Sequence, residues 1–216
     1  MIKDRKVIKS VRGHRTQDGA GVNLVRVLGN ETVYDFDPIL MLDSFDTTNP
    51  EDFSAGFPTH PHRGIETVTF IADGSISHKD NLGNEATVSD GGAQWLTAGS
   101  GAFHSEFLSA ETRLLGVQMW LNLPKKDKMC PPAYQSIDNK DIQEFDFDGG
   151  KLRLICGEYQ GHQGYQSKYL PLSYYDIILD PHAKLSLDMA IDDSVMAFTL
   201  QGNAIIGGSK VMEKTA

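Results

Sequence analysis

The sequence predicts an all-β protein made of two tandem domains, and three observations support this prediction. Short runs rich in Val, Ile, Thr and Phe recur between Gly, Asn and Asp residues, a pattern typical of β-sandwiches and β-barrels. No stretch of a dozen residues keeps apolar side chains at helical spacing, so little helix is expected. The length of 216 residues exceeds the roughly 100 to 150 residues of a common domain, which favours two domains.

The strands expected in the first half of the chain are short. Polar and apolar side chains alternate from Thr67 to Ile71, and Asp73-Gly74 follows as a turn signal. One short helical turn is expected near residues 49–53. The expected strands cover residues 22–28, 66–72, 85–88, 94–97 and 114–121.

A charged and proline-rich stretch, NLPKKDKMCPP, divides the chain. It predicts an extended, exposed connector over residues 124–132. We therefore place one domain at residues 1–123 and a second at residues 133–216. In the second domain, strands are expected at residues 137–147, 151–156, 174–179, 183–187 and 194–200.

Composition and charge exclude several classes of protein. Lys and Arg number 20 against 29 Asp and Glu, a net charge of -9, which disfavours direct binding to nucleic acid or to an anionic membrane surface. The start of the chain lacks the apolar core of a signal peptide, and no stretch approaches the ~20 apolar residues that span a bilayer. Cys130 and Cys156 are the two cysteines, and their spacing implies no disulfide framework. We expect a cytoplasmic protein.

Two short motifs carry the residues suited to chemistry. The HPH motif of His60 and His62 has the spacing that places both imidazoles on one face of a strand, and the HSE motif of His104 and Glu106 repeats it. Taken alone, each motif is more simply a polar strand face in contact with water. A barrel strand normally directs apolar side chains inward, however, so three histidines and an acid there would be costly without a compensating cation. Together the motifs predict a metal site formed by His60, His62, His104 and Glu106.

This donor set suits several metal ions. Three histidines with one carboxylate can bind Fe(II), Mn(II), Co(II), Ni(II), Cu(II) or Zn(II), because affinity alone follows a general order and does not select one metal. An octahedral ion held by four protein ligands keeps two positions open, enough for dioxygen and a chelating substrate.

Longer blocks around both motifs carry a family resemblance. They are FPTHPHRGIETV at residues 57–68 and QWLTAGSGAFHSE at residues 94–106. With them the sequence resembles the pirin family, a two-barrel branch of the cupins, over residues 3 to about 200. The resemblance implies two tandem cupin (jelly-roll-type) barrels. Pirin-like chains ordinarily continue well past the strand that matches residues 195–200, so we expect an incomplete C-terminal barrel, whose exposed strand edges would favour dimerisation.

The resemblance also implies a cofactor and two kinds of activity. In the pirin family a single Fe(II) is held by the residues that correspond to His60, His62, His104 and Glu106. Some members cleave flavonols such as quercetin with O2, which would make Glu106 the base that takes the substrate hydroxyl proton. Others bind regulatory protein partners in a redox-sensitive way, which would make this chain a non-catalytic metal and redox sensor. A third interpretation is a regulator of a larger enzyme with a structural metal.

Other side chains near the two motifs are alternative or supporting candidates for the site. Glu66 completes a general cupin pattern, HxHxxxE, with His60 and His62, but the resemblance favours Glu106 as the ligand and leaves Glu66 in a supporting or structural role. His78 precedes the turn signal at residues 81–84, so we expect it on the surface. The aromatic candidates for a hydrophobic mouth over the metal are Trp95, Phe53, Phe57 and Phe103.

Overall fold

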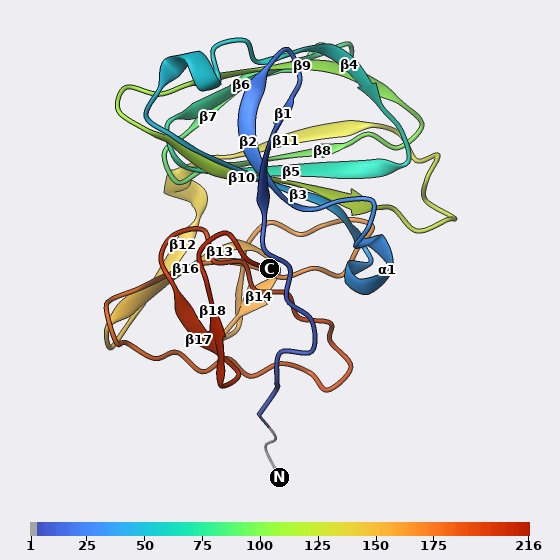
Figure 1. Cartoon of the computed structure of the whole chain (residues 1–216). Coiled ribbons are helices and arrows are strands. Elements are labelled where there is room, and N and C mark those ends of the chain that lie inside the picture. The colour runs from blue at the N-terminus through green and yellow to red at the C-terminus, as the bar shows by residue number, and fades with distance from the viewer. Residues whose placement is uncertain (1–3) are drawn as a thin grey trace.

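The computed structural model describes residues 4–216, and nearly every regular element in it is a β-strand (Figure 1). Two facing sheets form the upper part of the molecule in Figure 1, here called the N-terminal barrel. The larger sheet contains, in spatial order, β1 (His14–Asp18), β2 (Val22–Leu28), β3 (Ile39–Thr47), β10 (Leu114–Asn122), β5 (Ile65–Asp73), β8 (Ala93–Thr97) and β11 (Ala133–Ile137). The smaller sheet contains β4 (Phe57–His62), β9 (Ala102–Ser109), β6 (Ser75–Asp80) and β7 (Glu85–Ser89).

Apolar side chains hold these two sheets together at one end of the barrel. Ile76 and Leu108 of the smaller sheet belong to one buried cluster with Phe45 and Ile71 of the larger sheet. Two short helical elements connect strands of the barrel, α1 (Val33–Phe36) and η1 (Pro50–Asp52). The five strands and the helical turn expected from the sequence of the first half are confirmed.

Both faces of the larger sheet are covered by other parts of the protein. Side chains that follow one another along its strands point alternately to its inner and outer face. On β5, β8 and β10, residues directly opposite one another share a face. The outer face carries Val68, Trp95 and Met119, which pack against the C-terminal half. The inner face carries Gln94 and Gln118, which are directed toward the smaller sheet.

The C-terminal half forms smaller sheets below the N-terminal barrel (Figure 1). They are the sheet of β12 (Gln143–Phe147), β13 (Gly150–Cys156) and β16 (Tyr174–Leu179), the pair β14 (Glu158–Tyr159) and β15 (His162–Gln163), and the pair β17 (Ala204–Ile206) and β18 (Ser209–Val211); η2 (Asn139–Asp141) precedes them. Ile155 and Cys156 of β13 join the apolar core on the outer face of the larger sheet. As expected from the sequence, this half is β-structured, and its strands form three separate sheets over the residues described.

Two strands expected in this half are not formed. Residues 183–187 and 194–200 form no helix or strand, and exposure alternates along the first of them. Met196 and Phe198 pack against the apolar core on the outer face of the larger sheet, here called the junction core. Alternating apolar residues alone therefore led to the strand prediction there. The strand expected at 137–147 is divided by η2 into the end of β11 and β12.

The segment predicted to connect the domains is folded into turns. The amide of Asp127 donates to the carbonyl of Pro124, and the amide of Cys130 donates to Asp127, so the segment is not extended as expected. Its end lies against Gly99, where a Cβ atom would come within 2.2 Å of the Cys130 carbonyl oxygen and where φ is +50°, so this turn requires glycine. β11 follows the segment and pairs with β8 of the N-terminal barrel. The boundary at residues 124–132 stays a prediction.

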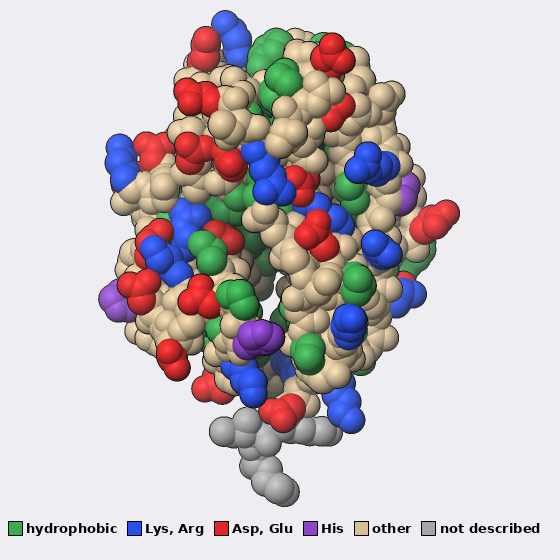
Figure 2. Space-filling model, turned by 60° about the vertical axis from the view of Figure 1, so that its left-hand side comes forward, with side chains coloured by type: hydrophobic (Ala, Val, Ile, Leu, Met, Phe, Trp, Pro, Cys, Tyr) green, Lys and Arg blue, Asp and Glu red, His purple; other side chains and the backbone are tan. Residues whose placement is uncertain are grey.

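The surface shows charge of both signs. On the face in Figure 2, acidic and basic side chains are intermixed over both halves, and hydrophobic side chains surround an opening in the lower half. In residues 4–216 no helix is long and apolar enough to cross a membrane.

Candidate metal centre

Three histidines converge inside the N-terminal barrel. His60 and His62 lie on β4 and His104 lies opposite His60 on β9. The Nε2 atom of His60 is 3.0 Å from Nε2 of His62 and 3.0 Å from Nε2 of His104. β4 is an edge strand of the smaller sheet, where the proline between the two histidines is tolerated because the missing N–H faces no neighbour. The structure therefore brings these three predicted site residues together.

Hydrogen bonding fixes the orientation of His60. Its Nδ1 lies 2.8 Å from the carbonyl oxygen of Pro58, which can only accept, so Nδ1 carries the proton. Nε2 of His60 then presents a lone pair to Nε2 of His104. If His104 does the same, two lone pairs meet at 3.0 Å, an arrangement that a cation between them would relieve.

Burial disfavours the protonated form of His62 and His104. Burial, followed by the neighbouring His60, lowers the pKa of His62 to about 4. Burial and then His60 and His62 lower the pKa of His104 to about 2. Neutral imidazoles with free lone pairs are the form that binds metals.

Glu106 lies near His104 but outside the group of three histidines, and two amides hold its carboxylate. Its Oε1 accepts a hydrogen bond from Gln94 Nε2 at 2.6 Å and its Oε2 accepts one from Gln118 Nε2 at 2.9 Å. Burial raises the pKa of Glu106, and the hydrogen bond from Gln118 opposes that shift. The carboxylate shares a potential ligand group with His104 and His78, whereas His60, His62 and His104 form the other group. His104 is common to both.

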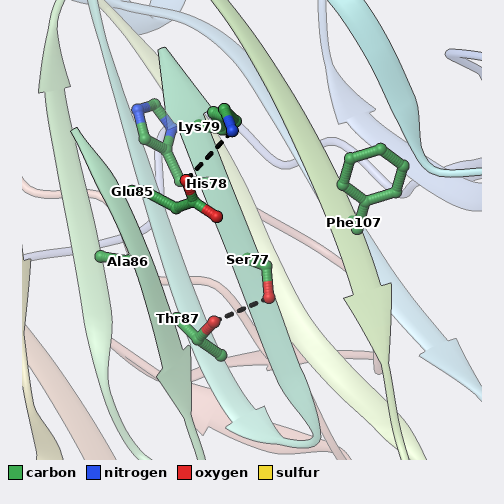
Figure 3. A pocket seen from close by; sticks show the side chains of 7 residues that line it. All are labelled: Ser77, His78, Lys79, Glu85, Ala86, Thr87 and Phe107. Carbon is green, nitrogen blue, oxygen red and sulfur yellow. Dashed lines mark hydrogen bonds and ion pairs between the residues drawn. The ribbon is translucent and has the colours of Figure 1, made fainter. Parts of the chain in front are cut away.

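His78 lies inside the barrel, so the expectation of a surface position is wrong. It is 1% exposed because β6 pairs with β9 in a register that sets His78 opposite Glu106 and Asp80 opposite His104. Its Nδ1 lies 3.3 Å from Nδ1 of His104, and its Nε2 lies 3.0 Å from Asp80 Oδ2. Figure 3 shows a hollow on this sheet that Ser77, His78 and Phe107 help to line. In this view the imidazole of His78 points away from the side chains of Ser77 and Phe107.

The aromatic residues at the site are not the expected ones. The Trp120 ring packs against His62 with centroids 4.9 Å apart, and the Tyr134 ring stacks on His78 at 4.1 Å with an interplanar angle of 12°. The Tyr134 hydroxyl also donates to Gln94 Oε1 at 3.1 Å. No motif in the sequence marked either residue.

The four aromatics proposed for the mouth of the site lie elsewhere. Trp95 is on the outer face of the larger sheet, in the junction core. Phe53 and Phe57 are buried in the apolar end of the barrel, and Phe103 is 54% exposed on the outer side of β9. For Trp95 and Phe103 the position follows from the alternation of side chains along the strand, whose inward face the sequence alone did not determine.

Glu66 points away from the histidines. It shares the outer face of β5 with Val68 and lies opposite Thr97 of β8, whose hydroxyl donates to Glu66 Oε1 at 2.7 Å. Burial raises the pKa of Glu66, against the hydrogen bond from Thr97. Its structural role therefore belongs to the junction between the halves.

The spacing of the three histidines fits a metal ion. Imidazole nitrogens bind such ions at about 2.0–2.1 Å, so two of them at a right angle would lie roughly 3.0 Å apart. The Nε2 separations of His60 from His62 and from His104 have this value. The donor set, the burial and the lowered pKa values all favour a cation at this point.

The fold and the site define a cupin-type β-barrel protein with a histidine cluster suited to a metal ion. The sequence profile of the pirin family matches residues 21–121. A putative quercetin 2,3-dioxygenase of Pseudomonas aeruginosa is 38% identical over 99% of this chain and 77% of its own length. A pirin-like protein of Arabidopsis thaliana is 37% identical over 98% of this chain and 68% of its own.

A solved structure agrees. The crystal structure of quercetin 2,3-dioxygenase from Acinetobacter baumannii matches with a TM-score of 0.83 and 30% identity, over 99% of this chain and 78% of that one. The chain belongs to the pirin family. The predicted family and cupin fold are confirmed, and membership together with the histidine cluster implies a metal cofactor.

Proposed function

We propose that His60, His62, His104 and Glu106 bind a single metal ion and that the chain is an O2-dependent flavonol 2,3-dioxygenase with Fe(II) as its metal. The observation that carries the proposal is the convergence of three imidazoles, with Nε2 of His60 3.0 Å from Nε2 of both His62 and His104. Relatives named as putative quercetin 2,3-dioxygenases support quercetin and similar flavonols as the substrate class.

Glu106 is the fourth ligand in this proposal. It lies two residues from His104 on the same face of β9, and it shares a potential ligand group with that histidine. Glu66 is set aside because it faces the junction on the other side of the larger sheet. Fe(II) is chosen over Mn, Co, Ni, Cu and Zn by resemblance, because affinity alone would not select it.

When bound by His60, His62, His104 and Glu106, the metal would supply Lewis-acid and redox chemistry for O2 and the flavonol. The chain supplies the surroundings. Glu106 takes the proton of the flavonol hydroxyl, and the amides of Gln94 and Gln118 keep its carboxylate in place. Trp120 and Tyr134 cover His62 and His78 with apolar ring surface and reduce water access.

The test combines metal analysis with flavonol turnover. Iron-loaded protein in air should bleach the quercetin absorbance, and His60→Ala and His104→Ala should each lose most bound iron and at least about 100-fold in turnover. The matched control is His162→Ala, which removes an exposed histidine of β15 and should leave both unchanged. Iron-loaded protein that leaves quercetin intact in air would contradict the activity, and full iron binding by His104→Ala would contradict the ligand set.

One feature of the structure favours the alternative, a non-catalytic metal and redox sensor that binds a partner protein. β16 is an edge strand of its sheet, and Ile177, Ile178 and Leu179 at its end are 37%, 53% and 45% exposed. Such an edge can pair with another chain, including a second copy. Pull-downs with Fe(II)-loaded and Fe(III)-loaded protein should recover different partners under this alternative, and identical sets would contradict it.

A further inference from the structure

Asp80, His78 and His104 form a continuous chain of polar contacts that ends at the proposed metal site. Asp80 Oδ2 lies 3.0 Å from His78 Nε2, and His78 Nδ1 lies 3.3 Å from His104 Nδ1. The side chains of His78 and His104 are each 1% exposed, so water does not compete for these contacts. The remaining nitrogen of His104, Nε2, is the one that faces His60.

Asp80 is anchored as an acceptor. Its Oδ1 accepts the backbone amides of Leu82 at 2.9 Å and Asn84 at 3.0 Å, and its Oδ2 accepts the Asn84 side-chain amide at 2.8 Å. Burial would raise the pKa of Asp80, but the hydrogen bonds from Asn84 and His78 outweigh it and lower the pKa. A carboxylate can only accept, so His78 Nε2 must donate to it.

The direction of both hydrogen bonds, from His78 to Asp80 and from His104 to His78, follows from that one donor. When the Nε2 atom of a neutral His78 carries the proton, its Nδ1 has a lone pair and accepts from Nδ1–H of His104. The Nε2 atom of His104 is then left without a proton and directs its lone pair at His60. The opposite polarity would place the Nε2 lone pair of His78 against the Asp80 carboxylate.

We propose that Asp80 and His78 are positioning residues that hold His104 in the tautomer whose Nε2 binds the metal. This rests on the proposed metal site and assigns a role to two residues outside the four ligands. The stacking of Tyr134 on His78, nearly parallel at 12°, keeps the intermediate ring in the plane that the contact with His104 needs. Groups that orient a metal-bound histidine commonly change metal affinity by about 10 to 100-fold when they are replaced.

Asp80→Asn would reverse donor and acceptor along the contacts from residue 80 to His104, while the side chain keeps its shape. Its Oδ1 can keep the backbone amides of Leu82 and Asn84, and the new NH2 group replaces the Oδ2 that faces His78 and the Asn84 side chain, whose amide must then turn its oxygen toward it. His78 would then accept at Nε2 and donate at Nδ1, which forces the proton of His104 onto Nε2. An amide in place of an orienting carboxylate selects the wrong histidine tautomer in serine proteases in the same way.

The direct test is the protonation of the histidine rings in the metal-free full-length chain, read from long-range ¹⁵N–¹H NMR correlations. We expect His104 to carry its proton on Nδ1 in the wild type and on Nε2 in Asp80→Asn. Zn(II) affinity, measured by chelator competition, should fall at least about 10-fold in Asp80→Asn. Glu85→Gln, which removes an exposed carboxylate from the neighbouring strand, should change neither.

A second pair of variants separates hydrogen bonding from shape. His78→Gln keeps an acceptor for His104, whereas His78→Phe keeps a ring against Tyr134 but accepts nothing. Zn(II) affinity should be near that of the wild type in His78→Gln and about 10-fold lower in His78→Phe. Equal affinities in this pair, or an Nε2 proton on His104 in the wild type, would overturn the proposal. The expected spectra and affinities in a protein inactive on flavonols would support the positioning role and contradict the proposed activity.

Discussion

The two faces of the larger sheet differ in what they bury. On the inner face, Gln94 and Gln118 donate to Glu106, which lies between two sheets among histidines. On the outer face, Trp95 and Met119 pack against the C-terminal half in an apolar core. Residues one position apart in the same strands therefore serve a polar site and an apolar junction.

The comparison shows what sets the role of a buried acid. Glu106 has an amide donor for each of its oxygens, whereas Glu66 has one hydroxyl donor, and its Oε2 makes no hydrogen bond to any residue that the structure describes. An acid with paired donors can be kept charged for a metal or a proton transfer. An acid with an unpaired oxygen in an apolar junction is stable mainly in its neutral form.

The largest loss of stability is expected at a polar contact beside this apolar core, between the two halves of the protein. Arg153 of β13 is 5% exposed and donates to the Gly91 carbonyl at 2.6 Å, to Asn139 Oδ1 at 2.6 Å and to Asp176 Oδ2 at 3.1 Å. Arg153→Met should reduce the free energy of unfolding by about 3 kcal/mol, because it leaves a mostly buried carboxylate unpaired. Urea denaturation measures this. Lys151→Met, two residues away at the partly exposed end of the same strand face, where its partner Glu144 is 40% exposed, is the control, and an equal loss there would contradict the account.

A smaller loss of stability is expected on the inner face of the larger sheet. Gln118→Leu should cost about 2 kcal/mol in the metal-free protein, because Glu106 Oε2 loses its donor while remaining buried. Denaturation monitored by circular dichroism measures the change. Gln135→Leu makes the same replacement at an exposed position of β11 and should have little effect. A Gln118→Leu protein as stable as the control would show that this hydrogen bond does not hold the carboxylate.

The smallest effect is expected at Glu66 and depends on pH. Burial raises its pKa above the ordinary value of 4.5, so the folded state holds the proton more tightly than the unfolded state. Stability from this group is complete below about pH 4.5 and is lost as pH rises through the folded pKa. Glu66→Gln should therefore gain stability relative to the wild type as pH increases from 4.5 to 8. A constant difference between the two proteins across that range, or no gain beyond that of exposed Glu51→Gln, would contradict this.

Much of the N-terminal barrel could be predicted because local patterns and the fold agree there. β2 covers residues 22–28 as expected, and the turn after Asp73 joins β5 to β6. The expected strands at 183–187 and 194–200 show the limit of this reasoning. Alternating apolar residues specify an extended chain, but a strand also needs a neighbour to pair with, and the sequence does not reveal one.

The site could be predicted in part for a related reason. The spacing of His60 with His62 and of His104 with Glu106 places each pair on one strand face whatever the fold. The inward position of His78 depends on the register between β6 and β9, and that of Tyr134 on the pairing of β11 with β8. Both are pairings between strands distant in sequence, and no motif in either strand encodes them.

The central claim is that one metal ion binds among three imidazoles, two of which are buried. Crystals of the iron-loaded protein, measured on both sides of the iron absorption edge, test it most directly. The account predicts one strong anomalous peak per chain, about 2 Å from Nε2 of His60, His62 and His104. A stoichiometrically loaded protein whose peak lies away from these three atoms would contradict it.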